Sequence, residues 1–390
     1  MVKLFKKGLF LLAAGVVIWM AFPQYTGALS VPAGSSPAPL PGNGPNRPVA
    51  GLEGPQTAPP GWFSNRDCAQ PLAIMPLGNS ITRGKQGTGP SQESPFNYGF
   101  RYYLDVSLSD NGYQFDFIGR QVSGEQSGFI FDYDNNGFAG DRADELRPRL
   151  SMTSTIPFSS TEIAPLLAPD QHPDVILLHI GTNDIAQGQT ITSTVADVSG
   201  ILDDIDDFDP EIVVIVAQII DQNVPEPEVA NFNALLASMV QNRMNNDGDK
   251  LALVDMYNAL VYPADMADSL HPNDSGYNKM GDVWYAELAS IWPACVVITS
   301  TAVTTATVGE PYTYDVDAVA DPQPITYTLN NPPSGMSINP VTGVISWQPT
   351  LAQAGLQPIE VVVSNSVLTT TQLFTIEVKA KTLYLPLITK

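Results

Sequence analysis

The strongest constraint on the fold is an alternation of short apolar runs with amphipathic segments over residues 63–295. The apolar runs are rich in Val, Ile, Leu and Phe, as in strands buried on both faces of a sheet. The segments between them, such as Val229–Met244 and Gly276–Ile291, have helical periodicity. This order favours a parallel sheet with right-handed crossovers and helices on both faces. The predicted strands are Leu72–Leu77, Phe115–Ile118, Val175–Ile180, Ile212–Ile219 and Leu251–Val254.

The chain changes character near Val297. Helical periodicity ends there, and Thr, Val, Ser and Pro dominate. Short alternating runs separated by turn signals predict an antiparallel β-sandwich over residues 296–381. Trp347 is interpreted as a core residue of this sandwich rather than as a sugar-stacking platform. The predicted strands are Pro311–Val316, Ile325–Leu329, Met336–Ile338, Gly343–Trp347, Glu360–Val363 and Gln372–Val378.

The N-terminal residues have the pattern of an export signal. Three lysines within the first seven residues precede the apolar run Gly8–Phe22, and the small residues that follow indicate cleavage after Ala28. The run is short for a spanning helix, so a signal peptide over residues 1–28 is favoured over an uncleaved anchor. We therefore expect a secreted or extracellular protein with no membrane contact after cleavage.

Two further segments lack the composition of a packed core. Residues 29–62 are predicted to be a linker, because nine of the thirty residues from Val31 to Pro60 are proline, which favours extended chain. Residues 382–390 form a short apolar tail that is too short to span a membrane. A last strand and a sorting tail are both open interpretations of it.

The net charge limits the classes of binding partner, and the two cysteines raise the question of a disulfide. The 390 residues carry 18 basic and 40 acidic side chains, a formal net charge of −22. Such a chain repels nucleic acid and anionic membranes, and it suits a neutral partner such as a polysaccharide. The two cysteines, Cys68 and Cys295, lie just before the first predicted strand and just after the last helix of the α/β region. Export permits a disulfide between them, and two free thiols are the alternative.

Three short polar segments of the α/β region carry the candidate chemistry. Ser80 ends a small-residue turn after the first strand, which places its hydroxyl at the carboxyl end of the sheet, where open α/β folds bind ligands. Asn183 follows the third strand, and its amide can donate to an oxyanion. Taken alone, each is more typical of a turn or a helix cap.

Asp268 and His271 form the third segment. Three residues apart, they can share one face of a helical turn, where the carboxylate fixes the imidazole tautomer and the other ring nitrogen reaches a serine. Of the other histidines, His172 is expected in a surface loop and His179 inside a strand, as a core or near-site residue with its hydrogen bonds satisfied. Core packing does not require the joint placement of all three segments, which favours a catalytic site.

These segments resemble a known superfamily. Gly78-Asn79-Ser80, Gly181-Thr182-Asn183-Asp184 and Asp268-Ser269-Leu270-His271 are similar to blocks I, III and V of the SGNH (GDSL) hydrolases. Four more segments resemble the family 3 carbohydrate esterases, which include acetyl xylan esterases. They are Ile74-Met75-Pro76, Gly99-Phe100-Arg101-Tyr102-Tyr103-Leu104, Phe115-Asp116-Phe117-Ile118-Gly119 and Gly140-Asp141-Arg142-Ala143-Asp144-Glu145.

The resemblance implies a flavodoxin-like, three-layer α/β/α fold with a five-stranded parallel sheet. It implies a secreted serine esterase acting on O-acyl esters of carbohydrate, with acetyl as the expected acyl group. Ser80 would be the nucleophile, His271 its base and Asp268 the partner of that base. The oxyanion hole would comprise the Ser80 N–H, the Gly140 N–H and the Asn183 side chain. No cofactor or metal is expected.

Two departures from the family pattern bear on this interpretation. Asn79 stands where the family has Asp; it loses the charge but still hydrogen-bonds in the turn, so we expect retained activity. The branch has His-Glu-Gly where this chain has Asn135-Asn136-Gly137, and an aromatic residue where it has Asp141. Residues 132–137 loosely resemble a calcium loop, but a solvated loop is favoured because a downstream acid at the required spacing is missing.

The C-terminal region resembles the immunoglobulin-like domains of bacterial surface proteins over Gly335–Trp347. Such modules act as spacers or adhesion units, so association with the cell surface is an open expectation. Two functional alternatives also remain: a lipid or thioester acyl hydrolase with the same site, and a non-catalytic glycan-binding or adhesion protein with a degenerate site. The sugar, the acyl length and the oligomeric state stay open.

Overall fold

The computed structural model describes residues 62–63, 67–87, 96–150, 165–224 and 227–381. The predicted signal peptide over residues 1–28 and the tail over residues 382–390 lie outside the described residues, as does the predicted linker except for its last residue, Trp62. In the part of the chain that the structure describes, no helix is both long enough and apolar enough to cross a membrane.

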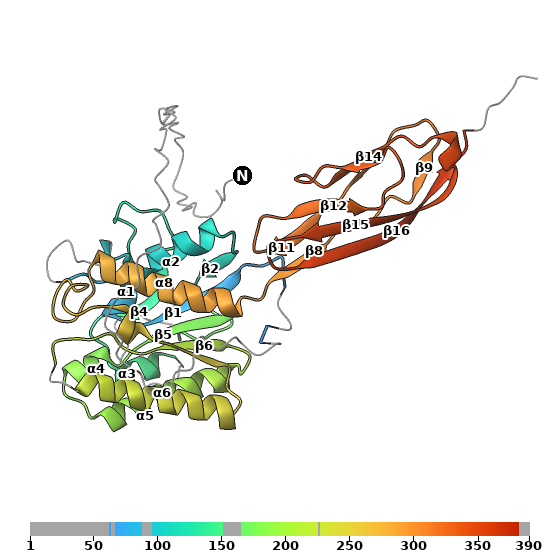
Figure 1. The fold of residues 1–390 in the computed structure, drawn as a ribbon. Helices are drawn as coiled ribbons and strands as arrows, with labels where there is room; N and C mark the ends of the chain where they lie inside the picture. Colours follow the sequence, from blue (N-terminus) through green and yellow to red (C-terminus); the bar gives the residue numbers. More distant parts are fainter. Residues whose placement is uncertain (1–61, 64–66, 88–95, 151–164, 225–226, 382–390) are drawn as a thin grey trace, which may run out of the picture. The chain divides into compact units, whose positions relative to one another are not determined.

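A parallel sheet forms the centre of the α/β region (Figure 1). Its order is β3-β4-β1-β5-β6-β7, and β2 also pairs with β1. The strands are β1 Leu72–Asn79, β2 Phe115–Phe117, β3 Gln121–Val122, β4 Asp134–Phe138, β5 Val175–His179, β6 Val213–Ala217 and β7 Leu251–Val254. The predicted parallel α/β fold is confirmed.

The strand count needs a correction. Five positions are parallel, as predicted, but the position beside β1 is shared by two strands. β2 pairs with residues 72–74 of β1, and β4 pairs with residues 77–79. Beyond them the short β3 runs antiparallel to β4, so the sheet has seven strands. β2 is too short to run beside the whole of β1, which leaves the far half of that edge open for β4.

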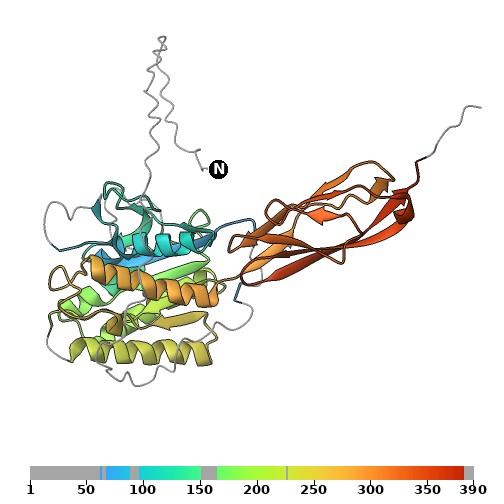
Figure 2. The same cartoon turned by 45° about the horizontal axis from the view of Figure 1, so that its top comes forward.

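Long helices cover both faces of the sheet. α2 (Gly99–Asp110) and α8 (Asp274–Ile291) lie on one face, and α5 (Ile191–Phe208) and α6 (Glu228–Asn246) on the other (Figures 1 and 2). Because alternate strand residues point to opposite faces, two cores form. Ile74 packs with the α2/α8 layer, while Met75 packs with the α5/α6 layer. This two-sided burial explains why the strands read as continuous apolar runs.

Short helices lie mostly at the ends of the strands. They are α1 Ser80–Arg83, α3 Ala143–Leu146, the 3-10 turn η3 Arg147–Arg149, α4 Thr182–Ala186 and α7 Met256–Ala259. α1, α3 and α4 follow β1, β4 and β5, three adjacent strands, so the loops that precede them meet at one edge of the sheet.

The predicted solvated loop at residues 132–137 is wrong for most of its length. Asp134–Phe138 is the strand β4, and Asn135 and Asn136 are fully buried. The Asn135 amide donates to the Ser123 hydroxyl at 3.0 Å, and its oxygen accepts from the Gly137 N–H at 2.9 Å. A polar sequence can form a buried strand here because its side chains find such hydrogen bonds.

The C-terminal region is all-β, as predicted, with a core that includes Trp347. Its sheets are β10-β14-β13, β11-β8 and β12-β15-β16-β9. One detail differs from the prediction: β9 and β16 are parallel, not antiparallel. The strands are β8 Cys295–Ile298, β9 Thr305–Thr307, β10 Tyr312–Asp315, β11 Ala318–Asp321, β12 Thr326–Asn330, β13 Ser337–Ile338, β14 Val344–Trp347, β15 Gly355–Ser364 and β16 Thr369–Lys379.

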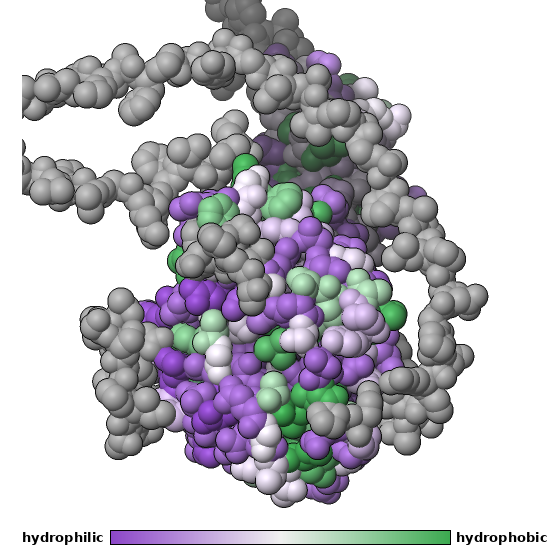
Figure 3. Space-filling view, turned by 90° about the vertical axis from the view of Figure 1, so that its left-hand side faces the viewer, coloured by the Kyte–Doolittle hydropathy of each residue, from purple (hydrophilic) through white to green (hydrophobic). Residues whose placement is uncertain are grey.

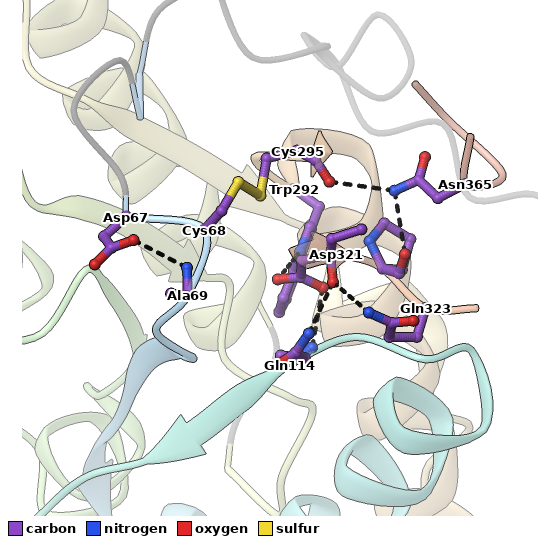
Figure 4. Close-up of a disulfide and its surroundings, with 11 residues drawn as sticks. Asp67, Cys68, Ala69, Gln114, Trp292, Cys295, Asp321, Gln323 and Asn365 are labelled. Atoms are coloured by element: carbon purple, nitrogen blue, oxygen red, sulfur yellow. Dashed lines mark hydrogen bonds between the residues drawn. A yellow bond between two sulfur atoms is a disulfide. The ribbon is translucent and has the colours of Figure 1, made fainter. Parts of the chain in front are cut away.

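A disulfide joins Cys68 to Cys295, with the two Cα atoms 6.1 Å apart (Figure 4). It joins two positions 227 residues apart in the sequence, from the segment before β1 to the first residue of β8. Close by, the buried carboxylate of Asp321 accepts from the Gln114 N–H at 3.0 Å and from the Trp292 indole at 3.1 Å. The pairing that the sequence left open is therefore formed.

Candidate active site

Ser80 lies at the junction of β1 and α1. Asn79 caps the helix, because its side-chain oxygen accepts from the Ile81 N–H at 3.0 Å. Gly78 permits the close packing of this turn: a Cβ on it would lie 2.2 Å from the His179 carbonyl oxygen of the neighbouring strand. Ser80 is 4% exposed. Asn79 thus fills the structural role expected of it in the turn without a negative charge.

His271 approaches Ser80 from the loop between α7 and α8. Its Nε2 lies 2.9 Å from the Ser80 Oγ, and its Nδ1 lies 2.9 Å from Oδ2 of Asp268. The Asp268 Oδ1 also accepts from the backbone N–H groups of Leu270, at 2.8 Å, and His271, at 2.7 Å. The three predicted side chains therefore form one hydrogen-bonded chain, Ser80–His271–Asp268.

The predicted helical turn at Asp268–His271 is not present. These residues form a bend between Met266 and Pro272, which are joined by a β-bridge. The Ala267 N–H donates to the His271 carbonyl at 2.8 Å and closes the bend. The three-residue spacing still brings carboxylate and imidazole together, because the bend folds the backbone as tightly as a helical turn would.

The electrostatics of the pair suit proton transfer. Burial lowers the pKa of His271, and this outweighs the opposing effect of the Asp268 carboxylate. Burial raises the pKa of Asp268, but the hydrogen bonds from the His271 ring and from two backbone N–H groups outweigh it and lower that pKa overall. Near neutral pH the carboxylate is ionised and the imidazole is neutral, the state a general base requires.

Gly140 lies in the turn after β4, and Asn183 is the second residue of α4, the short helix after β5. β4 and β5 are the two strands on either side of β1. Gly140 has φ +92°, a left-handed backbone that favours glycine, and apart from its chain neighbours no atom of the described residues lies within 4 Å of where its Cβ would be. Asn183 is 5% exposed, and its Nδ2 donates to the Asp141 carbonyl at 2.8 Å. Figure 3 faces this edge of the sheet, where the surface is largely hydrophilic with separate hydrophobic patches.

Arg101 hydrogen-bonds to the helix α1, which begins at Ser80, and the sequence analysis did not predict this role. It is fully buried, and its guanidinium donates to the carbonyls of Thr82, at 3.2 Å, and Arg83, at 3.1 Å, both in α1. It also donates to the carbonyls of Asn97 and Ser123. Burial lowers the pKa of Arg101 to about 10. The segment that resembles the family contains this residue, but its carbonyl partners are visible only in the fold.

The remaining histidines stay outside the hydrogen-bonded chain. His172 has a half-exposed side chain that contacts Asp209 at 2.9 Å. His179 is the last residue of β5 and is fully buried, and burial lowers its pKa to about 4. Its ring nitrogens have no hydrogen-bond partner among the described residues. His179 is therefore a neutral core residue, and the prediction that its hydrogen bonds are satisfied is wrong for the described residues.

Two family models match the chain. The GDSL-like lipase/acylhydrolase family matches residues 77–279, and the family described as "Putative Ig domain" matches residues 294–379. The chain is 26% identical over 235 residues to the "Multidomain esterase" of Ruminococcus flavefaciens. That alignment covers 56% of this chain and 28% of the relative, so the chain spans less than a third of the length of that curated protein.

Two of the solved structures to which the chain is similar are described as family 3 carbohydrate esterases. The "Clostridium thermocellum family 3 carbohydrate esterase" is 25% identical, with a TM-score of 0.45, over 56% of this chain and 96% of that one. A "carbohydrate esterase family 3 from Talaromyces cellulolyticus" is 20% identical, with a TM-score of 0.44 over the same shares of both chains.

Proposed function

The chain belongs to the GDSL-like lipase/acylhydrolase family, and from this premise we propose that it removes O-acetyl groups from carbohydrate through Ser80, His271 and Asp268. Membership of that family makes it a carboxylic ester hydrolase. The observation that carries the proposed site is the hydrogen-bonded chain from the Ser80 hydroxyl through the imidazole to the carboxylate. Nucleophile, base and orienting group stand in the order that acyl transfer requires.

The reaction proceeds in two halves. The Ser80 Oγ attacks the ester carbonyl carbon while His271 Nε2 takes the hydroxyl proton, and the C–O bond to the sugar then breaks as the imidazolium returns that proton to the leaving oxygen. Water attacks the acyl-serine in the same way, and the carboxylic acid leaves. Asp268 stabilises the imidazolium in both halves and keeps its own charge.

The oxyanion hole consists of the Ser80 N–H, the Gly140 N–H and the Asn183 amide. The support for it is topological: β4, β1 and β5 are adjacent, so the segments that follow these strands and carry the donors meet at one edge of the sheet. Asn183 has two N–H donors on one nitrogen. One is directed at the Asp141 carbonyl, which leaves the other for the developing negative charge.

Carbohydrate is the proposed substrate class on two grounds. Four segments of the α/β region resemble the family 3 carbohydrate esterases, and the net charge of −22 disfavours anionic substrates. The test compares acetate release from acetylated xylan with hydrolysis of a long-chain lipid ester and of an acyl thioester, using wild type and Ser80→Ala. Acetate release by wild type alone supports the proposal. Faster hydrolysis of the lipid ester or the thioester would assign the same site to another acyl substrate.

We also propose that the protein is exported and that residues 1–28 are its signal peptide. The Cys68–Cys295 disulfide supports this, because disulfides persist in oxidising compartments. Expression in a bacterium with an export pathway, followed by N-terminal sequencing of the extracellular protein, tests it. A mature chain beginning near residue 29 is expected, and an intact N-terminus on a membrane-bound protein would contradict the proposal. Attachment to a cell surface through the C-terminal region remains a proposal of the same kind.

A further inference from the structure

The turn that carries Gly140 is held by an ion pair that neither the sequence nor the family pattern pointed to. Arg149 reaches back to Asp141, with its Nε 2.7 Å from Oδ2 and a terminal nitrogen 3.3 Å from Oδ1. The two side chains are only 23% and 12% exposed. A two-pronged guanidinium–carboxylate contact of this kind fixes orientation as well as distance, and partial burial protects it from solvent screening.

Arg149 holds both ends of the turn. Its guanidinium carbon lies 4.4 Å from the centre of the Phe138 ring, the last residue of β4. The Asp141 N–H donates to the Phe138 carbonyl at 3.2 Å and closes the turn around Gly140. The Gly140 N–H thus sits inside a closed turn whose first and last residues both contact one side chain.

Asp141 connects this turn to the third proposed oxyanion donor. Its carbonyl accepts from the Asn183 Nδ2 at 2.8 Å, and that bond sets the rotation of the amide about its last torsion. The rotation decides where the second N–H of Asn183 points. Moving the Asp141 backbone would therefore redirect two of the three donors, Gly140 directly and Asn183 through its hydrogen bond.

We propose that the Asp141–Arg149 pair is the positioning element of the oxyanion hole. The inference rests on the proposed function, since it takes Gly140 and Asn183 as the donors. Asp141 and Arg149 are positioning residues and do not touch the reacting atoms. Donors aimed at the oxyanion act in the transition state more than in the ground state, so loosening them lowers kcat and leaves KM nearly unchanged.

The chain offers a matched control two residues away. Arg147, in the same 3-10 turn, makes a similar two-pronged but more exposed pair with Asp204 of α5, at 3.0 and 2.9 Å. This pair involves the same chemistry and the same element, but it contacts neither Gly140 nor Asn183 in any described hydrogen bond. Arg147→Gln therefore measures the effect of losing a guanidinium–carboxylate pair on stability alone.

The experiment measures kcat and KM with 4-nitrophenyl acetate for wild type, Ser80→Ala, Asp141→Asn, Arg149→Gln, the double variant and Arg147→Gln. Asp141→Asn keeps the backbone carbonyl and the shape of the side chain. We expect kcat to fall about tenfold or more in both single variants with KM within twofold, because a small displacement of catalytic groups costs up to about a hundredfold. The double variant should be no slower than the slower single variant, since the ion pair proposed to position the donors is already lost in each single variant.

The outcomes separate the two proposals. A wild type no faster than Ser80→Ala would refute the proposed function and the inference with it. An active wild type whose kcat is unchanged in Asp141→Asn and Arg149→Gln would overturn the inference alone. An equal loss of kcat in Arg147→Gln would also overturn it, because the effect would then be one of general stability, and thermal unfolding of each variant identifies that case.

Discussion

The α/β region and the C-terminal β region differ in where they bury polar groups. Among the described residues, and with Tyr and Trp counted as aromatic, every buried polar or charged side chain except Asp321 belongs to the α/β region. The core of the β region is otherwise built from aliphatic and aromatic residues such as Trp347. Burying a polar group costs free energy unless the group is hydrogen-bonded. The α/β region buries many such groups, whereas the β region buries few.

This difference matches the proposed roles of the two regions, with catalysis in the α/β region and a purely structural core in the β region. Several buried polar residues of the α/β region, including Ser80, Asn183 and His271, gather at the carboxyl ends of β4, β1 and β5 or contact residues there. Perturbed and buried polar groups concentrate where a reaction needs them. The β region has the composition of a module whose core serves stability. Each of the following predictions tests that division.

The largest expected effect is on kcat, and it distinguishes two buried amide side chains of the α/β region. Asn183→Ala removes a proposed oxyanion donor and should lower kcat about a hundredfold or more. Asn233→Ala is the matched control: Asn233 is also buried, and its amide bonds both backbone groups of Ile219, 2.8 Å from each. Its loss should cost about 1–3 kcal/mol of unfolding free energy with kcat within twofold. Equal kcat in both variants would mean that burial of an amide does not mark the site.

The sequence predicted most strands of the α/β region and the residues of the proposed site, and the elements that it missed were missed for physical reasons. Two-sided burial made β1, β5, β6 and β7 visible as apolar runs. The prediction missed β4 because the polar side chain of Asn135 makes its hydrogen bonds inside the fold, which no local pattern reveals. Asp268 and His271 were found because they are close in sequence, although in a bend rather than a helical turn.

Contacts that depend on tertiary placement were beyond the sequence. The pairing of Cys68 with Cys295 was left open, because only the fold brings their Cα atoms to 6.1 Å. The Arg149–Asp141 pair was not foreseen, since either side chain could equally have faced solvent. A strand-and-helix interpretation of the sequence thus predicted the residues of the proposed site, whereas the groups proposed to position them were visible only in the structure.

A smaller effect is expected from the pH dependence. The base must be neutral, so the rate falls as pH drops through the pKa of His271, about tenfold per unit below it. Burial lowers this pKa beyond the opposing effect of Asp268, so the acid limb of kcat/KM should have its midpoint below about 6.5, the ordinary value for histidine. Asp268→Asn removes the opposing charge and should move the midpoint lower still. A wild-type midpoint at or above about 7 would contradict this assignment of the base.

The smallest effect on catalysis, and the one that tests the supporting role of the β region, is expected from Trp347. Its indole is 4% exposed, packs edge-on against Tyr312 with ring centres 6.2 Å apart, and donates to the Ser334 carbonyl at 3.3 Å. Trp347→Ala should cost the β region about 3–5 kcal/mol, because it leaves a cavity in an apolar core.

Calorimetry of Trp347→Ala should show an unfolding transition shifted to lower temperature. The kcat and KM for 4-nitrophenyl acetate should stay within twofold of wild type at temperatures where the α/β region remains folded.

Phe232→Ala, at a fully buried position in the α5/α6 layer, provides the opposite case. Phe232 packs against Gly181, the residue before α4, so its loss opens a cavity beside the helix that carries Asn183. It should therefore reduce kcat as well as stability. If Trp347→Ala instead reduced kcat as much as Phe232→Ala, the β region would be part of the catalytic unit, and the division drawn from buried polar groups would fail.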